Sequence, residues 1–198
     1  MRRLLAVVVL VAGPVGACAE PAVVSPGPPA VSIASPSSPP AASATHEPIG
    51  RLPDDCEPGP DPVPVSDHVG HGIGGDPAWA IGFGADGTLG FNPDDPYRGR
   101  GWLRKVLWLV GDTAADQVTV TGHRTDDEAS LWFAYPGPDA QVTSLVLDPS
   151  TPDGEHGDWF EYRGYFVVPA AGCYRLEAVW PGGGWEVDMS AGLEPTQG

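Results

Sequence analysis

The stretch Arg104-Lys105-Val106-Leu107-Trp108-Leu109-Val110 decides the fold class of this chain. Its last five residues are apolar without interruption, and Gly111-Asp112 ends the run. The apolar positions also fit helical spacing, but the run is shorter than most globular helices. The short length and the Gly-Asp stop therefore favour a buried β-strand.

Similar short runs follow on both sides, separated by Gly, Pro, Asn and Asp. In Ala78–Phe83 the period of two places Trp79, Ile81 and Phe83 on one face, and Thr88–Phe91 is expected to pair with this run as a hairpin. Such spacing predicts an all-β chain, an antiparallel β-sandwich with under about 10% helix. The predicted strands are 78–83, 88–91, 104–110, 117–124, 130–135, 142–147, 160–168, 172–180 and 184–190.

Charge excludes one class of partner. Acidic side chains outnumber basic ones 26 to 10, which gives a net charge of −16 over 198 residues. Because a phosphate backbone attracts clustered Lys and Arg, we expect no nucleic-acid binding, and the domain itself is a poor partner for an anionic membrane surface.

The N-terminus has the pattern of an export signal. Arg2-Arg3 precede an apolar run from Leu4 to Ala12, which is too short to span a bilayer. Val15-Gly16-Ala17-Cys18 then resembles a lipobox, in which the cysteine is acylated after cleavage. The alternative is ordinary cleavage after the A-x-A sequence Ala17-Cys18-Ala19. We favour a lipoprotein signal peptide over residues 1–17 and palmitate-type acylation at Cys18.

A tether is expected next, over residues 18–64. Thirteen of the 24 prolines lie between Pro21 and Pro64, among Ser and Ala, and aromatic residues are absent there. Such a segment buries too little apolar area to offset the entropy of ordering it. The predicted organisation is a disordered tether, a sandwich domain over residues 65–192 and a disordered tail over 193–198.

The three cysteines predict one disulfide. Either cleavage removes Cys18 from the free thiols, which leaves Cys56 and Cys173 in an oxidising compartment. The alternative is two free buried thiols. We favour a Cys56–Cys173 bond that fastens the end of the tether to the domain.

Two motifs carry a resemblance. Lys105–Val110 and Val168-Pro169-Ala170-Ala171-Gly172-Cys173-Tyr174 are similar to signatures of a family of uncharacterised bacterial secreted lipoproteins. The second motif also resembles the strand entry of bacterial immunoglobulin-like domains. The resemblance covers about Pro77 to Ser190 and implies an extracytoplasmic immunoglobulin-like domain without an assigned catalytic residue. The acidic insertion Asp148–Asp158 departs from the pattern.

Catalytic motifs are missing from the sequence. It contains no Gly-x-Ser-x-Gly elbow, no Ser-x-x-Lys, no His-Glu-x-x-His and no P-loop. We therefore predict a protein that is not an enzyme and needs no cofactor, with a metal-dependent hydrolase as the least favoured alternative.

Two clusters are weak candidates for metal binding. His68 and His71 lie beside an aspartate, but a spacing of three does not bring both rings to one side of a strand or loop. The loop after Asp148 is rich in carboxylates, and Ca²⁺ is the cation it would bind, weakly. We favour solvated polar loops in both cases. The candidate ligands are Asp67, His68 and His71 in the first cluster, and Asp153, Glu155 and Asp158 in the second.

The tryptophans divide into two groups by their neighbours. Trp79, Trp108 and Trp132 lie in apolar runs and are expected in the core. A second group, beside Gly, Arg or Asp, is expected at strand ends, where rings among carboxylates can stack on sugars. Packing remains the favoured interpretation for this group too: Trp102, Trp159 and Trp185.

The sequence thus predicts a non-catalytic binding or structural module. It would be held outside the cytoplasm on the bacterial cell membrane or outer membrane by its N-terminal lipid, and would meet an extracellular ligand or an envelope protein. A carbohydrate-binding module is the alternative.

Overall fold

Strands are the only regular elements in the part of the chain that the structure describes. The computed structural model describes residues 48–57, 59–114 and 116–193, so the predicted signal peptide, Cys18 and the predicted tail beyond Leu193 lie outside the described residues. No helix in these ranges is long and apolar enough to cross a membrane. The strands are β1 (Val63–Ser66), β2 (Gly70–Gly75), β3 (Ala78–Ile81), β4 (Leu89–Phe91), β5 (Tyr97–Arg98), β6 (Gly101–Gly111), β7 (Val118–Arg124), β8 (Trp132–Ala134), β9 (Gln141–Val142), β10 (Ser144–Leu147), β11 (Gly154–His156), β12 (Trp159–Val168), β13 (Gly172–Trp180) and β14 (Gly183–Leu193).

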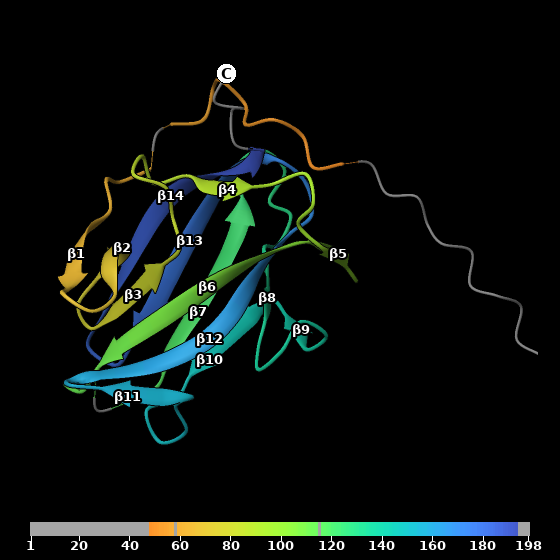
Figure 1. Ribbon diagram of the computed structural model, residues 1–198. Helices are drawn as coiled ribbons and strands as arrows, with labels where there is room; N and C mark the ends of the chain where they lie inside the picture. The colour runs from red at the N-terminus through yellow and green to blue at the C-terminus, as the bar shows by residue number, and fades with distance from the viewer. Residues whose placement is uncertain (1–47, 58, 115, 194–198) are drawn as a thin grey trace, which may run out of the picture. The chain divides into compact units, whose positions relative to one another are not determined.

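The strands form two sheets that face each other across a shared core (Figure 1). The nine-stranded sheet has the order β1-β2-β3-β6-β12-β8-β9, with β5 on β6 and β11 on β12. The five-stranded sheet has the order β10-β7-β13-β14-β4. All pairs are antiparallel except β4 with β14, which is parallel. The expected all-β, antiparallel architecture is therefore confirmed, with one parallel pair at an edge.

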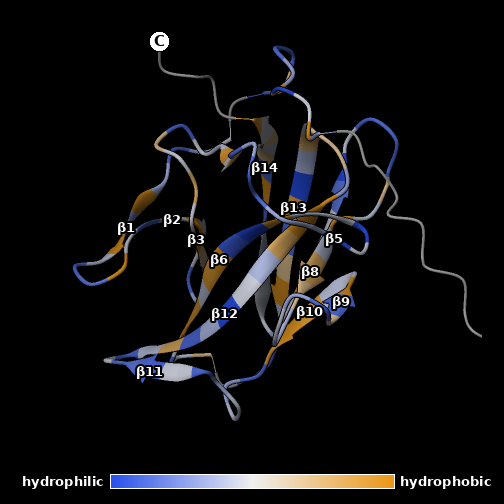
Figure 2. Cartoon of the chain, turned by 45° about the vertical axis from the view of Figure 1, so that its right-hand side comes forward, coloured by the Kyte–Doolittle hydropathy of each residue, from blue (hydrophilic) through white to orange (hydrophobic). Residues whose placement is uncertain are grey.

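The apolar run that decided the fold class is the middle strand of the larger sheet. β6 pairs with β12 from Trp102↔Val168 to Gly111↔Trp159, and with β3 on its other side. Figure 2 shows hydrophobic residues along β6 and hydrophilic residues in many of the connections. The run is unbroken because the outer face of β6 is also covered around Leu109, which is 1% exposed, although Leu107 on that face is only half-buried. Val106, Trp108 and Val110 face the main core, whereas Leu103 packs with Ala134 and Val167 in a second small cluster.

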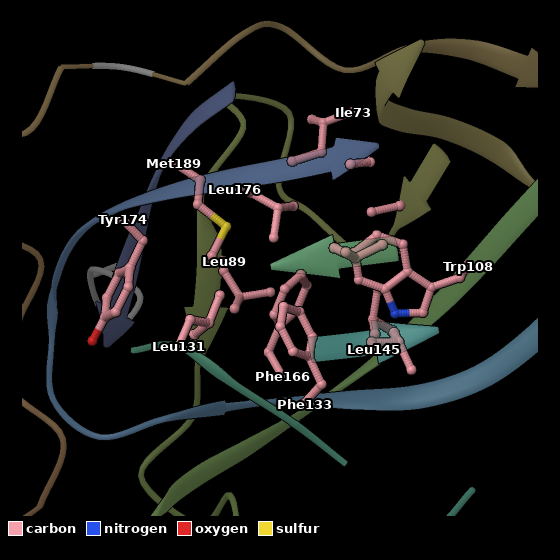
Figure 3. Close-up of a cluster of buried hydrophobic side chains, with 14 of the residues drawn as sticks. Ile73, Leu89, Trp108, Leu131, Phe133, Leu145, Phe166, Tyr174, Leu176 and Met189 are labelled. Carbon is pink, nitrogen blue, oxygen red and sulfur yellow. The ribbon is translucent and has the colours of Figure 1, made fainter. Parts of the chain in front are cut away.

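Aromatic rings fill the main core. Trp108, Phe133 and Phe166 contact one another at centroid distances of 5.5 to 6.2 Å. Figure 3 shows these rings on one side of the cluster and Tyr174 on the other, with Leu176 and Met189 between. Tyr174, Leu176 and Ala178 of β13 all point inward and are fully buried, in keeping with the alternation of a strand.

The expectation that Trp79 lies in the core is wrong. The buried residues of β3 are Ala78 and Ala80, and the face that Trp79 shares with Ile81 is only half-buried. The expected hairpin between 78–83 and 88–91 does not form either, because β2 and β6 already occupy both edges of β3.

The chain leaves the first sheet after β3 instead of turning back. Gly82 has a φ of 130°, which glycine adopts readily. The following loop closes on itself, since Gly84 N–H donates to Thr88 O and Gly87 N–H donates to Gly84 O. β4 therefore joins the opposite sheet, beside β14. The predicted strand 142–147 is likewise divided between the sheets, as β9 and β10.

The end of the predicted tether belongs to the domain. Ile49 is 3% exposed within the main core, and β1 begins at Val63, before the expected boundary at residue 65. Leu193 N–H donates to Gly50 O, so the first residue of the predicted tail is also part of the fold. The proline content hid this packing, because one buried isoleucine and backbone pairing suffice to hold an extended segment in place.

A disulfide bond fastens this segment to the five-stranded sheet. Cys56 and Cys173 are bonded, with Cα atoms 5.3 Å apart and a sequence separation of 117, which confirms the predicted pairing. Cys173 follows the buried Gly172 at the start of β13 and points to the outer face of its sheet. Cys56 therefore lies at that outer face, where the disulfide holds it, whereas Ile49 of the same segment reaches the core.

Ile49 provides a test of this boundary. Replacing it with alanine (Ile49→Ala) should lower the free energy of unfolding by about 2–4 kcal/mol, because a buried methyl cluster is lost and a cavity remains. Val63 is 43% exposed, so Val63→Ala should cost about 0.5 kcal/mol or less. Denaturant unfolding measures both changes. Equal small losses would mean that residues before 63 contribute nothing to the core.

Candidate functional site

A groove lies around Trp180, where the β13–β14 turn meets two other connections. Trp180 is the last residue of β13 and pairs with Gly183 across Pro181-Gly182. Gly182 has a φ of 102°, which suits the glycine position of a turn that begins with proline. A Cβ atom on Gly183 would lie 3.1 Å from Cζ2 of Trp180, so the ring lies directly over this glycine.

Two adjoining hollows make up this groove. One has a volume of about 330 Å³ and lies toward the β2–β3 turn and the β6–β7 connection. The other, of about 780 Å³, lies toward β7 and the loop after β10. They share Asp116, Trp180 and Pro181. We define the Trp180 groove by the residues that line either hollow: Asp76, Pro77, Thr113, Ala114, Asp116, Gln117, Thr119, Asp148, Pro149, Ser150, Val179, Trp180 and Pro181.

The alternation of β13 explains why a tryptophan stands there. Trp180 has the same parity as Tyr174, Leu176 and Ala178, which face the core. It therefore continues the inward face to the end of the sandwich, where its ring packs partly against the core and remains half-exposed. Val179, of the opposite parity, is 47% exposed. The strand end thus presents apolar surface to solvent on both sides.

One carboxylate in the groove is held in a fixed orientation. Asp148 Oδ1 accepts hydrogen bonds from Ser150 Oγ at 2.6 Å and Ser150 N at 2.8 Å, and its Oδ2 accepts one from Gln117 Nε2 at 2.7 Å. These bonds, those of Ser150 foremost, lower the pKa of the Asp148 carboxyl below its ordinary value, because they favour the charged form. Asp148 therefore keeps its negative charge at neutral pH.

The chemistry of the groove is that of a binding surface. It combines one aromatic ring with carboxylates, amide and hydroxyl groups, and prolines at its margins. Ring faces attract C–H surfaces and cations, while carboxylates and hydroxyls pair with polar hydrogens of a ligand. Such a surface can hold a sugar or a cationic group.

The three tryptophans expected at strand ends are packed, which was the favoured interpretation. Trp102 lies at the start of β6 and is 7% exposed in the core, with its ring 5.5 Å from that of Tyr97. Trp185 is half-buried and donates a hydrogen bond from Nε1 to Ala78 O. Trp159 is also half-buried, close to Gly111. These three rings do not form a common surface with Trp180, because only Trp180 lines the groove.

Of the tryptophans expected in the core, only Trp108 is fully buried. Trp79 is half-buried and donates from Nε1 to Asp76 Oδ1. Trp132 is half-buried beneath the guanidinium of Arg100, which lies 4.0 Å from the ring centroid. Both rings occupy outward positions that other side chains cover, which strand alternation alone does not reveal.

The predicted metal candidates are separated from one another, with one exception. No group of three or more His, Cys, Asp or Glu side chains within the described ranges is arranged to hold a metal ion. Both oxygens of Asp153 are engaged, by the Tyr135 hydroxyl and by Arg163 N–H. Exposed positions are occupied by the other five candidates: Asp67, His68, His71, Glu155 and Asp158.

The exception joins the two predicted clusters. The ring of His68 contacts that of His156, with centroids 4.3 Å apart. His156 was not among the predicted ligands, although it lies between Glu155 and Asp158 in the second cluster. The sequence feature that could have indicated this contact is the presence of a histidine in each cluster. The sequence does not show that the fold brings the two histidines together.

Comparisons with known proteins gave no likeness: the chain matches no protein-family model, no curated protein and no solved structure.

Proposed function

We propose that this chain is a lipid-anchored, extracytoplasmic binding module with an immunoglobulin-like domain and no catalytic activity. The observation that carries the proposal is the Cys56–Cys173 disulfide. Disulfides persist in oxidising compartments and are rare in the cytosol, so the bond supports export. It also supports a tether, because it fastens the N-terminal segment to the domain at the point where a pull from the membrane would arrive.

One local feature supports the immunoglobulin-like assignment. Tyr174 lies near the start of β13, just after the chain has crossed from one sheet to the other. Its hydroxyl donates to Ala170 O at 2.6 Å, four residues upstream. This bond resembles the tyrosine corner of immunoglobulin-like sandwiches. The disulfide departs from that pattern, because it joins the N-terminal segment to one sheet instead of bridging the two sheets.

The Trp180 groove is the surface that we assign to binding. It lies at the end of the sandwich where several connections meet, as binding loops do in many sandwiches. An anchored module would carry this groove away from the membrane on the proline-rich tether, where it can reach an extracellular ligand or an envelope protein.

The anchor is tested by the mature N-terminus. Mass spectrometry of the protein from the membrane fraction should find Cys18 as the first residue, with diacylglyceryl on its thiol. Cys18→Ala should remove both the lipid mass and the association with the membrane fraction. An unmodified terminus at Glu20 would contradict the proposal.

A second candidate function is carbohydrate binding, favoured by the half-exposed ring of Trp180 among hydroxyls and carboxylates. Here the ring would stack on a pyranose while Asp148 and Ser150 accept from its hydroxyls.

Soluble neutral oligosaccharides, cello-oligosaccharides and N-acetylglucosamine oligomers, test this candidate by calorimetric titration. Trp180→Ala should weaken binding by about tenfold or more, because a central aromatic contact is lost. Trp132→Ala is the matched control, since Trp132 lies outside the groove, and it should leave the affinity unchanged. No binding by the intact protein, or equal binding by Trp180→Ala, would contradict the carbohydrate-binding hypothesis. Neither result would bear on the proposed lipid anchor.

A further inference from the structure

The contact between His68 and His156 lies outside the Trp180 groove and has no part in the core. His68 lies in the loop between β1 and β2, and His156 is the last residue of β11. Both are exposed, yet their rings meet at a centroid distance of 4.3 Å and an interplanar angle of 72°. Two hairpin ends that are far apart in the sequence thus present imidazoles to each other.

Both backbones are held in defined turns. Ser66 Oγ accepts hydrogen bonds from the N–H groups of His68 and Val69, at 3.3 and 3.4 Å. On the other side, His156 pairs with Trp159 across a tight turn in which Gly157 has a φ of 58°. Neither turn depends on the ring contact, so the two imidazoles are brought together by the fold itself.

The separation of the rings is close to that of two imidazoles on one ion. A metal ion about 2.1 Å from a ring nitrogen lies about 3.2 Å from the ring centroid, so two imidazoles that bind one ion with an N–metal–N angle of about 90°, as in a square-planar Cu²⁺ site, have centroids about 4.5 Å apart. The observed 4.3 Å lies near this value.

We propose that His68 and His156 form a two-imidazole site for one divalent transition-metal ion, which links the β1–β2 hairpin to the β11–β12 hairpin. Imidazole nitrogen suits Cu²⁺, Ni²⁺ and Zn²⁺, with Cu²⁺ bound most tightly, whereas Ca²⁺ and Mg²⁺ prefer oxygen. Because no third His, Cys, Asp or Glu of the described part joins the pair in a metal-binding group, water completes the coordination. The bound ion is therefore accessible and exchangeable.

The surrounding charge favours a cation at this place. Asp67 precedes His68, Glu155 precedes His156, and Asp158 follows in the next turn, all of them exposed. Carboxylates beside a binding site raise the local concentration of cations and speed their arrival. This contribution does not distinguish one cation from another, so selectivity rests on the two nitrogens.

Cu²⁺ is the probe for the test, because its paramagnetic resonance spectrum reports how many imidazole nitrogens bind it. The purified mature protein should bind one Cu²⁺ per chain with two nitrogens. His68→Ala and His156→Ala should each leave one nitrogen and weaken binding by about a hundredfold, since two ligands on one scaffold bind far more tightly than either alone. His46→Ala, His71→Ala and His123→Ala are the matched controls and should keep both nitrogens and the affinity.

Folding is checked separately. Circular dichroism and the melting temperature without metal are measured for all five variants. The side chains of His68, His71 and His156 are exposed, so their substitution should change neither quantity. With Cu²⁺ present, the melting temperature should rise in the intact protein and in the controls, and should not rise in His68→Ala or His156→Ala. A one-nitrogen spectrum in the intact protein, or equal affinities in His68→Ala and the controls, would overturn the proposal.

Discussion

Trp108, Phe133 and Phe166 fill the space between the two sheets with their rings in mutual contact. Full burial of side chains of this size stabilises the fold by about 1.5–3 kcal/mol each. Part of this gain is offset at Trp108, whose Nε1 has no hydrogen-bond partner within the described part of the chain. An unpaired buried donor costs about 1–3 kcal/mol. The indole is therefore retained for its volume, and the adjacent strand supplies small residues, Ala78 and Ala80, to accommodate it.

This core determines where the surface features lie. β13 contributes alternate side chains to the core, and its last inward residue, Trp180, lies beyond the region where the facing sheet can cover it. The Trp180 groove thus forms because β13 extends beyond the part of the sandwich where side chains are fully buried. The His68–His156 contact arises in the larger sheet, where β2 and β11 are linked through β3, β6 and β12. Groove and imidazole pair are separate surfaces of one domain.

Much of the fold could be predicted from sequence, because period-two patterns and Gly-rich breaks report directly on strands. The predicted strands 104–110, 160–168 and 172–180 correspond in this way to β6, β12 and β13. Which strands pair with one another was harder to predict than where the strands lie. The hairpin expected after β3 failed because turn chemistry is local, whereas the edges of β3 are occupied by strands distant in the sequence.

The candidate sites were less predictable than the fold. Strand alternation places Trp180 on the inward face of β13, as for a core residue. Its exposure follows from its position at the end of the sandwich, which the sequence does not show. Trp79 gave a similar error: its apolar neighbours suggested the core, yet its face of β3 is only half-buried. Proline content likewise concealed the burial of Ile49. These errors share one cause, since exposure depends on non-local neighbours.

The Cys56–Cys173 bond joins the fold to the proposed location, because it holds the segment that leads to the proposed anchor and because disulfides persist in oxidising compartments. Peptide mapping of the protein isolated from its host with its thiols blocked, and digested without reduction, tests this link most directly. We expect one peptide pair that joins residues 56 and 173 and no blocked thiol at either position. Blocked free thiols at both cysteines would contradict the account.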